Sequence, residues 1–184
     1  MFIHQVDEEI DLAIVTASHA HAMFHLMASS RDELRRWLGW AGSGTVDEYR
    51  EFVTRSAKRF AMGLGFYAGI RYQTRWAGAI DLVIDDHNQM GAVGFWLGEP
   101  FQGQGIMTRT LAAVTHLAFD EYQLNRLELR VAVGNTRSMA LAERSGFRQE
   151  GVLRQREWLN DRFSDVVVFG LLAQEWNRNA RSSD

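Results

Sequence analysis

The chain has 184 residues, of which 46% are hydrophobic and 23% charged, a balance typical of one folded globular domain. It contains no cysteine, which excludes disulfides, thiolate metal sites and a cysteine nucleophile. The net charge of −3 at pH 7 argues against a basic nucleic-acid-binding face, and no apolar run is long enough for a membrane span. Acidic residues among the first thirty positions argue against a signal peptide. We therefore expect one cytoplasmic domain over residues 1–184 that binds neither nucleic acid nor membrane.

The first third of the chain combines short strands with helices. Partial alternation of apolar and polar residues over 3–15 indicates strands, and Ser18 is placed to cap the helix that follows. Residues 31–40 read as a second helical piece. Thr45 followed by Glu48 is a capping box, which predicts a longer helix starting there.

The rest of the chain is dominated by strands. Three strands, a long helix, a strand, a short helix and a hairpin are expected at residues 66–72, 76–84, 92–97, 104–122, 126–133, 135–145 and 148–171. Asn160-Asp161 supplies the turn of the hairpin. This order of elements predicts an α/β (α+β) mixed sheet with helices on both faces.

The most informative segment follows the strand that ends at Leu97. Pro100 interrupts the strand, and the turn Gly103-Gln104-Gly105 opens the long helix. Amides at a helix N-terminus are unpaired and favour phosphate, and glycine lets a pyrophosphate approach the backbone closely. The same glycines could instead serve only to make a tight turn. The segment is not a Walker loop, because no Lys-Ser/Thr follows, and Thr108 breaks the Rossmann fingerprint.

This segment resembles the acyl-CoA pyrophosphate loop of the GNAT acetyltransferases, Gln/Arg-x-x-Gly-x-Gly/Ala. Gln102 and Gly105 match the pattern, whereas Met107 stands where Gly or Ala is usual. Gly-Gln-Gly-Ile-Met is similar to the RimJ/RimL branch, the ribosomal-protein N-terminal acetyltransferases. The segment 133–138 and the pair Gly146-Phe147 follow in the order of that family, so the resemblance extends over about residues 10–172.

The resemblance implies a GNAT acyl-CoA N-acyltransferase fold, a single domain with a core at about residues 10–172 and splayed central strands. It implies acetyl-CoA as co-substrate and no metal. The implied cofactor-binding residues are Phe95, Trp96, Leu97, Gln102, Gly103, Gln104, Gly105, Ile106, Met107, Thr108 and Asn135. A backbone N–H of the strand end is expected to meet the oxyanion. From the residues alone, Trp96 could be plain core and Asn135 a helix N-cap.

The resemblance also implies a catalytic base. Glu157 lies in Arg-Glu-Trp-Leu-Asn, which resembles the Glu-Tyr-Leu-Asn segment that carries the base in RimL-like enzymes, where it acts directly or through water. Without the resemblance, Glu157 would be an exposed hairpin carboxylate paired with Arg154 or Arg156, because most carboxylates lie on the surface.

Ser138 is the candidate general acid. It lies one helical turn after Asn135 and resembles the serine that protonates the departing thiolate in RimL-like enzymes. It could also be an ordinary first-turn serine. Many GNAT enzymes use a tyrosine instead, and Tyr67 and Tyr122 are available for that role.

Four aromatic and imidazole side chains near the N-terminus carry weaker signals. Trp37 and Trp40 are either buried or, by the resemblance, line the acceptor pocket. His21 and His25 have a spacing that suits zinc on a helix, but no third ligand is apparent, so we expect no metal site.

The function implied by the resemblance is acetyl transfer to the N-terminal α-amine of a protein of the ribosomal type. Direct attack in a ternary complex is expected because no cysteine could carry an acyl group. The same chemistry on a small amine (an antibiotic, toxin or polyamine) and a coenzyme A-binding sensor without turnover remain alternatives. A protein of this kind is expected to be a monomer or a homodimer.

Overall fold

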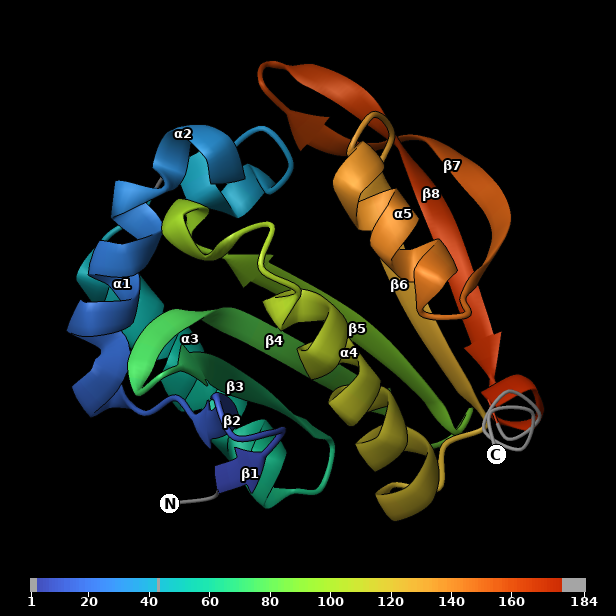
Figure 1. Cartoon of the computed structure of the whole chain (residues 1–184). Coiled ribbons are helices and arrows are strands. Elements are labelled where there is room, and N and C mark those ends of the chain that lie inside the picture. The colour runs from blue at the N-terminus through green and yellow to red at the C-terminus, as the bar shows by residue number, and fades with distance from the viewer. Residues whose placement is uncertain (1–2, 43, 177–184) are drawn as a thin grey trace.

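The computed structural model describes residues 3–42 and 44–176 (Figure 1). Its strands form one sheet in the order β1-β2-β3-β4-β5-β6-β8-β7. The strands are β1 Ile3–Gln5, β2 Ile10–Ile14, β3 Gly65–Tyr72, β4 Arg75–Asp85, β5 Met90–Leu97, β6 Arg126–Ala132, β7 Arg148–Leu159 and β8 Arg162–Leu172. Neighbouring strands are antiparallel except β5 and β6, which run parallel.

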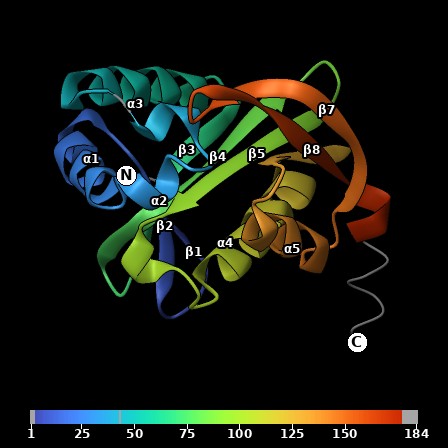
Figure 2. The same ribbon diagram turned by 90° about the horizontal axis from the view of Figure 1, so that it is seen from above.

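Helices cover both faces of this sheet. They are α1 Ala20–Ser29, α2 Arg31–Leu34, α3 Val46–Ala61, α4 Ile106–His116 and α5 Thr136–Arg144, with short turns η1 Ala17–His19, η2 Gly39–Gly42, η3 Glu99–Phe101 and η4 Leu117–Glu121. Figure 2 shows α1 and α3 on one face and α4 and α5 on the other. None of the helices within the described ranges is both long and apolar enough to cross a membrane.

Alternation along the central strands divides the buried side chains between two cores. Phe66 and Leu82 belong to the larger core, which also contains Leu111 of α4. Tyr67 and Ala79, on the opposite face, pack in a second core beneath α1 and α3. Successive residues of a strand point to opposite faces, so one run of sequence serves both layers.

Strands β5 and β6 separate at one end of the sheet. They pair only over Met90–Val93 and Arg126–Leu129. From Gly94 to Leu97, β5 is bonded to β4 on one side and has no strand partner on the side that faces β6. The expected GNAT fold class with splayed central strands is thus confirmed.

Most of the expected elements are present with boundaries shifted by one or two residues. The capping box is confirmed, because Glu48 N–H donates to Thr45 Oγ1 at 3.3 Å and Thr45 N–H donates to Glu48 Oε2 at 2.7 Å. The hairpin turn is also confirmed, with Asn160 and Asp161 at φ of 52° and 59°, as a type I′ turn requires.

Two local expectations were wrong. The helical piece at 31–40 is helical only to Leu34, because a turn follows before η2 begins at Gly39. The cap of the first helical segment is Thr16 rather than Ser18. The long helix was expected at about 104–122 and is present over 106–121, where its last turn is π-helical.

Candidate functional site

The turn between β5 and α4 depends on two glycines in the left-handed region. Gly103 and Gly105 have φ of 75° and 73°, which a side chain would strain. A Cβ added at either position would meet no other atom within 4 Å. The backbone geometry therefore requires glycine, and the space beside both residues is free for a ligand. The two explanations of these glycines, a tight turn and a phosphate site, are compatible.

The N-terminus of α4 presents free donors to that space. Gly105 is the N-cap and has no side chain to cap with, and no acidic residue lies in the first turn. The first helical backbone bond recorded runs from Arg109 N–H to Gly105 O at 3.1 Å, which leaves the amides of residues 106–108 for an external acceptor. Met107 is buried in the core, so its departure from the motif does not crowd the loop.

Gln102 links three parts of the site. Its Nε2 donates to Leu97 O at the end of β5 at 3.2 Å, and its Oε1 accepts from Arg137 Nη1 at 3.1 Å. Arg137 is exposed and belongs to the first turn of α5. Sequence reasoning did not assign a role to this arginine, although it lies between the two residues that the motif singled out, Asn135 and Ser138.

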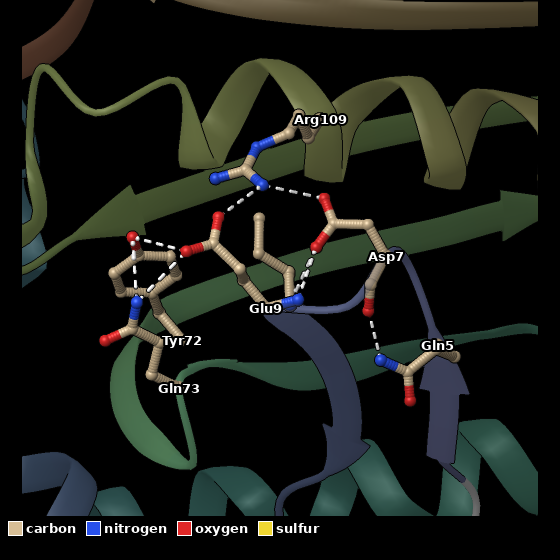
Figure 3. A network of polar contacts seen from close by, with 7 residues as sticks. Gln5, Asp7, Glu9, Tyr72, Gln73 and Arg109 are labelled. Atoms are coloured by element: carbon tan, nitrogen blue, oxygen red, sulfur yellow. Dashed lines mark hydrogen bonds and ion pairs between the residues drawn. The ribbon is translucent and has the colours of Figure 1, made fainter.

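A polar network anchors α4 to the start of the chain (Figure 3). Arg109 Nη1 lies 2.8 Å from Asp7 Oδ2 and 3.0 Å from Glu9 Oε2. Gln73 Nε2 and the Tyr72 hydroxyl donate to the other oxygen of Glu9 at 3.0 and 3.1 Å. These hydrogen bonds, from Gln73 first and then Arg109, hold the pKa of Glu9 below its usual value. The helix that follows the glycine turn is thus fixed by residues far away in the sequence.

Asn135 and Ser138 meet at the start of α5. Asn135 is the N-cap, and its Oδ1 accepts from Ser138 N–H at 3.2 Å. The described residues provide no recorded partner for Asn135 Nδ2 or for Ser138 Oγ, and both side chains are half-buried. The capping role therefore leaves an amide donor and a hydroxyl available to a ligand.

Glu157 lies on β7 immediately after a bulge. The register of β7 against β8 shifts between Leu153 and Glu157, where Gln155 has φ of 50° and donates its N–H to Asp165 Oδ1 at 2.8 Å. Glu157 is half-buried, and no ion pair with either neighbouring arginine is recorded among the described residues. The ion pair with Arg154 or Arg156 that was expected of an ordinary surface carboxylate is therefore not formed among the described residues.

The tip of the β7–β8 hairpin rests on the segment between α2 and η2. Asn160 Nδ2 donates to Arg36 O at 3.3 Å, and the place of a Cβ at Gly39 lies 3.0 Å from Trp158 O. Trp37 in the same segment approaches the turn before α5, with its ring 3.8 Å from the place of a Cβ at Gly134. This segment therefore lies close to β7 and to the turn before α5.

A cavity of about 550 Å³ lies between this segment and the face of the sheet beneath α1 and α3. Its walls are Phe24, Met27, Leu38, Trp40, Gly44, Thr45, Glu48, Tyr49, Phe52, Tyr67, Ala79, Asp81, Gly94, Phe95 and Trp96. Trp40 is half exposed and lines it, whereas Trp37 is not part of its wall. Trp96 is both a core residue and a wall of the cavity.

Buried polar groups line one side of the cavity. The Tyr67 hydroxyl lies 3.0 Å from that of Tyr49 and accepts from Trp96 Nε1 at 3.3 Å. Burial raises the pKa of Tyr67 to about 12, so it is protonated at neutral pH. Asp81 pairs with Arg59 of α3, yet burial still raises the pKa of Asp81 to about 6.

The remaining sequence candidates do not line this cavity. Tyr122 follows η4, about 24 Å from Ile106 at 1.5 Å per helical residue, and burial raises its pKa. His21 and His25 are exposed on α1. The described ranges contain no cluster of three or more side chains suited to hold a metal ion.

Comparison with known proteins gives one family. Residues 10–148 match the acetyltransferase (GNAT) domain. YdaF of Bacillus subtilis, provisionally named a ribosomal N-acetyltransferase, is 33% identical over 179 residues, which cover 96% of this chain and 98% of YdaF. The ribosomal-protein-serine acetyltransferase of Escherichia coli K12 is 29% identical over 167 residues, which cover 90% of this chain and 93% of that protein.

Solved structures agree with the sequence relatives. RimL, a ribosomal L7/L12 alpha-N-protein acetyltransferase solved with coenzyme A, has a TM-score of 0.89 at 28% identity and covers 93% of this chain and 98% of its own. The microcin C7 self-immunity acetyltransferase MccE, solved with acetyl-CoA and AMP, has a TM-score of 0.84 at 26% identity. The match covers 91% of this chain and 94% of the MccE chain. The chain therefore belongs to the GNAT acetyltransferase family and is an N-acetyltransferase related to the ribosomal-protein acetyltransferases.

Proposed function

We propose that this N-acetyltransferase transfers the acetyl group of acetyl-CoA to the α-amine at a protein N-terminus of the ribosomal type. The observation that carries the proposal is the free edge of β5. Residues 94–97 have no strand partner within the described part of the chain on the side facing β6, and they directly follow the pairing that holds the two strands together. Residues 94–96 also contribute to the wall of the cavity. One short segment thus adjoins both the phosphate-binding turn and the space for an acceptor.

The residues around the glycine turn, the start of α5 and the free edge of β5 fit acetyl-CoA. The amides of residues 106–108 and the Arg137 guanidinium supply donors and positive charge for the two phosphates. In this proposal, Asn135 Nδ2 and the free backbone groups of β5 bond the amides of the pantetheine arm, which is supported by their lack of a recorded partner among the described residues. Bound acetyl-CoA supplies the activated acetyl group. Binding of coenzyme A by RimL and of acetyl-CoA by MccE supports this assignment.

An α-amine is the acceptor that this set of groups can serve. Its reference pKa of about 7.7–8.0 means that the neutral form costs about 1 kcal/mol at pH 7, against about 4–5 kcal/mol for a lysine at about 10.4. One modest base is enough for that step. We assign it to the Glu157 carboxylate, which accepts the proton directly or through one water.

Two further groups complete the reaction. A backbone N–H of the β5 edge donates to the thioester carbonyl oxygen as negative charge develops there. Ser138 Oγ, which has no recorded partner among the described residues, donates a proton to the leaving sulfur. Because the chain has no cysteine, the amine attacks the thioester directly.

The polyamine alternative has less support. The carboxylates that might have recruited a polyamine, Asp32, Glu33 and Asp47, are each paired with an arginine one helical turn away. Other small amines and a sensor without turnover remain alternatives that an acceptor screen separates.

The test is mass spectrometry of products formed from acetyl-CoA with three sets of acceptors: peptides with free N-termini, the same peptides with blocked N-termini and an internal lysine, and small amines. The proposal predicts a mass increase of one acetyl group in the first set only. Acetylation of small amines alone would replace the protein acceptor with a small one. Binding of acetyl-CoA without any acetylated product would support the sensor.

A further inference from the structure

The floor of the cavity is a single row of residues across three strands. Tyr67 of β3 is in register with Asp81 of β4, which is in register with Gly94 of β5. All three line the cavity, and Ala79 and Trp96 form the next register pair on the same face. The floor therefore belongs to the rigid sheet, whereas the roof is built from α1, α3 and the segment that contains Trp40.

Gly94 leaves part of the cavity floor open. A Cβ at this position would meet no other atom within 4 Å, and its φ is not in the left-handed region. The backbone therefore does not require glycine, and the missing side chain only adds volume. The larger neighbours on the same floor, Trp96 and Tyr67, are bonded to each other.

The lining of the cavity is mostly apolar and aromatic, with the exposed Thr45 and Glu48 on α3's side and Asp81 on the floor. Phe24 and Phe52 of the roof face the sheet, and Trp40 stands at the exposed rim. A volume of about 550 Å³ is far more than a serine or alanine side chain needs and lies within the usual range for small-molecule pockets. An occupant that fills it removes a large apolar area from water.

Asp81 brings a carboxylate to the floor of the cavity. Its Oδ1 accepts from Arg59, and no partner for Oδ2 is recorded among the described residues, although Asp81 lines the cavity. The nearby Tyr67 hydroxyl is already engaged by Tyr49 and Trp96. Asp81 Oδ2 is thus a hydrogen-bond acceptor on the floor of a mostly aromatic cavity.

We propose that this cavity receives the side chain next to the acceptor amine, and that it selects a large aromatic group ending in a hydrogen-bond donor that reaches Asp81. A phenol such as that of an N-terminal tyrosine has this form. The proposal rests on the acetyl transfer to an α-amine argued above, and names the kind of acceptor that the site favours.

The first test compares peptides that differ only at residue one: alanine, serine, leucine, phenylalanine and tyrosine. The expected kcat/KM rises from alanine and serine to phenylalanine by about 10-fold or more, because apolar groups of this size are discriminated in that range. Tyrosine should exceed phenylalanine by about 10-fold through the bond to Asp81. Equal rates for all five, or a preference for alanine or serine, would overturn the proposal.

The second test fills the cavity. Gly94→Leu, with Gly94→Ala as a smaller step, should reduce kcat/KM for the tyrosine peptide about 10-fold or more relative to the alanine peptide. Gly151→Leu is the matched control, since Gly151 also lies in a strand with no atom within 4 Å of an added Cβ but does not line the cavity. A tyrosine-to-alanine ratio unchanged in both Gly94 variants would contradict the proposal.

The third test replaces the hydrogen-bond acceptor of Asp81 with a donor. In Asp81→Asn the amide oxygen stays with Arg59, so the NH₂ group turns toward the cavity and meets the phenol as a second donor. The preference for tyrosine over phenylalanine should disappear. Asp11→Asn is the control, because Asp11 forms a similar pair with Arg71 outside the cavity. A preference retained in Asp81→Asn would remove Asp81 from the site.

A binding measurement separates this proposal from the proposed function. Calorimetry with the N-acetylated tyrosine and alanine peptides needs no turnover. Tighter binding of the tyrosine product, weakened by Gly94→Leu, supports the cavity assignment even if no free peptide is acetylated. Rapid acetylation of peptides with no preference in rate or binding leaves the proposed function standing and refutes the cavity assignment.

Discussion

The pair formed by Asp81 and Arg59 leads to a specific prediction about stability and pH. The pKa of the Asp81 carboxyl is ordinarily 3.8. In the fold, burial raises this pKa to about 6 and outweighs the opposite effect of Arg59. The folded protein therefore holds a proton on Asp81 at pH values at which the unfolded chain has released it. The stability from this group is fully present below about pH 3.8 and is lost as the pH rises through about 6.

The magnitude follows from that difference. About two pH units at about 1.36 kcal/mol each correspond to about 3 kcal/mol at the most, and exposure of a quarter of the side chain reduces this to roughly 1–3 kcal/mol. Asp81→Asn removes the titration but keeps an oxygen for Arg59. The free energy of unfolding of the variant, minus that of the parent, should therefore rise by roughly 1–3 kcal/mol between pH 4.5 and pH 7.5.

The measurement is urea unfolding of both proteins at four pH values across that interval, with Asp11→Asn as a control. Only the difference between proteins is used, so the titration of all other groups cancels. A difference that stays constant with pH would show that burial does not dominate the environment of Asp81. A difference that falls as the pH rises would mean that Arg59 controls its pKa.

Three further predictions concern the donor and catalytic halves of the site. Gly105→Ala should raise KM for acetyl-CoA about 10-fold and cost about 1–2 kcal/mol of stability, because its φ of 73° strains any side chain; Gly151→Ala, titrated with urea in parallel, should show neither effect. Arg137→Ala should raise KM for acetyl-CoA several-fold with kcat unchanged, and steady-state assays at two salt concentrations should show a weaker salt dependence than in the parent. Glu157→Gln should lower kcat about 100-fold or more at pH 7 and leave acetyl-CoA affinity intact, as measured by calorimetry; full activity in that variant would exclude Glu157 as the base.

The donor half of the site was accessible from the sequence because it is contiguous. Strand, glycine turn and helix N-terminus occupy residues 94–108, and each local feature, including the left-handed glycines, follows from rules about single residues. Local rules were sufficient wherever a property depends on neighbours within one or two turns.

Features that depend on distant partners could not be derived in this way. The bulge before Glu157 changes the register of a strand whose alternation alone would place its side chains differently, and its cause is the Asp165 carboxylate across the hairpin. The anchoring of Arg109 by Asp7 joins residues about a hundred positions apart. The end of the helical segment at Leu34 coincides with the hairpin tip that rests on the following turn.

This division between local and distant features also separates two kinds of specificity. In the proposed site, binding of the donor depends on backbone amides at residues 106–108, whose positions are fixed by glycine φ values and by the Arg109 network rather than by side-chain identity. The acceptor cavity depends on side chains brought together from α1, α3 and three strands, with Gly94 and Asp81 setting its volume and polarity. Substitutions at Gly94 or Asp81 should therefore change which amine is acetylated while KM for acetyl-CoA stays nearly constant. Substitutions in the turn should change that KM equally for every acceptor, because the turn residues do not line the cavity.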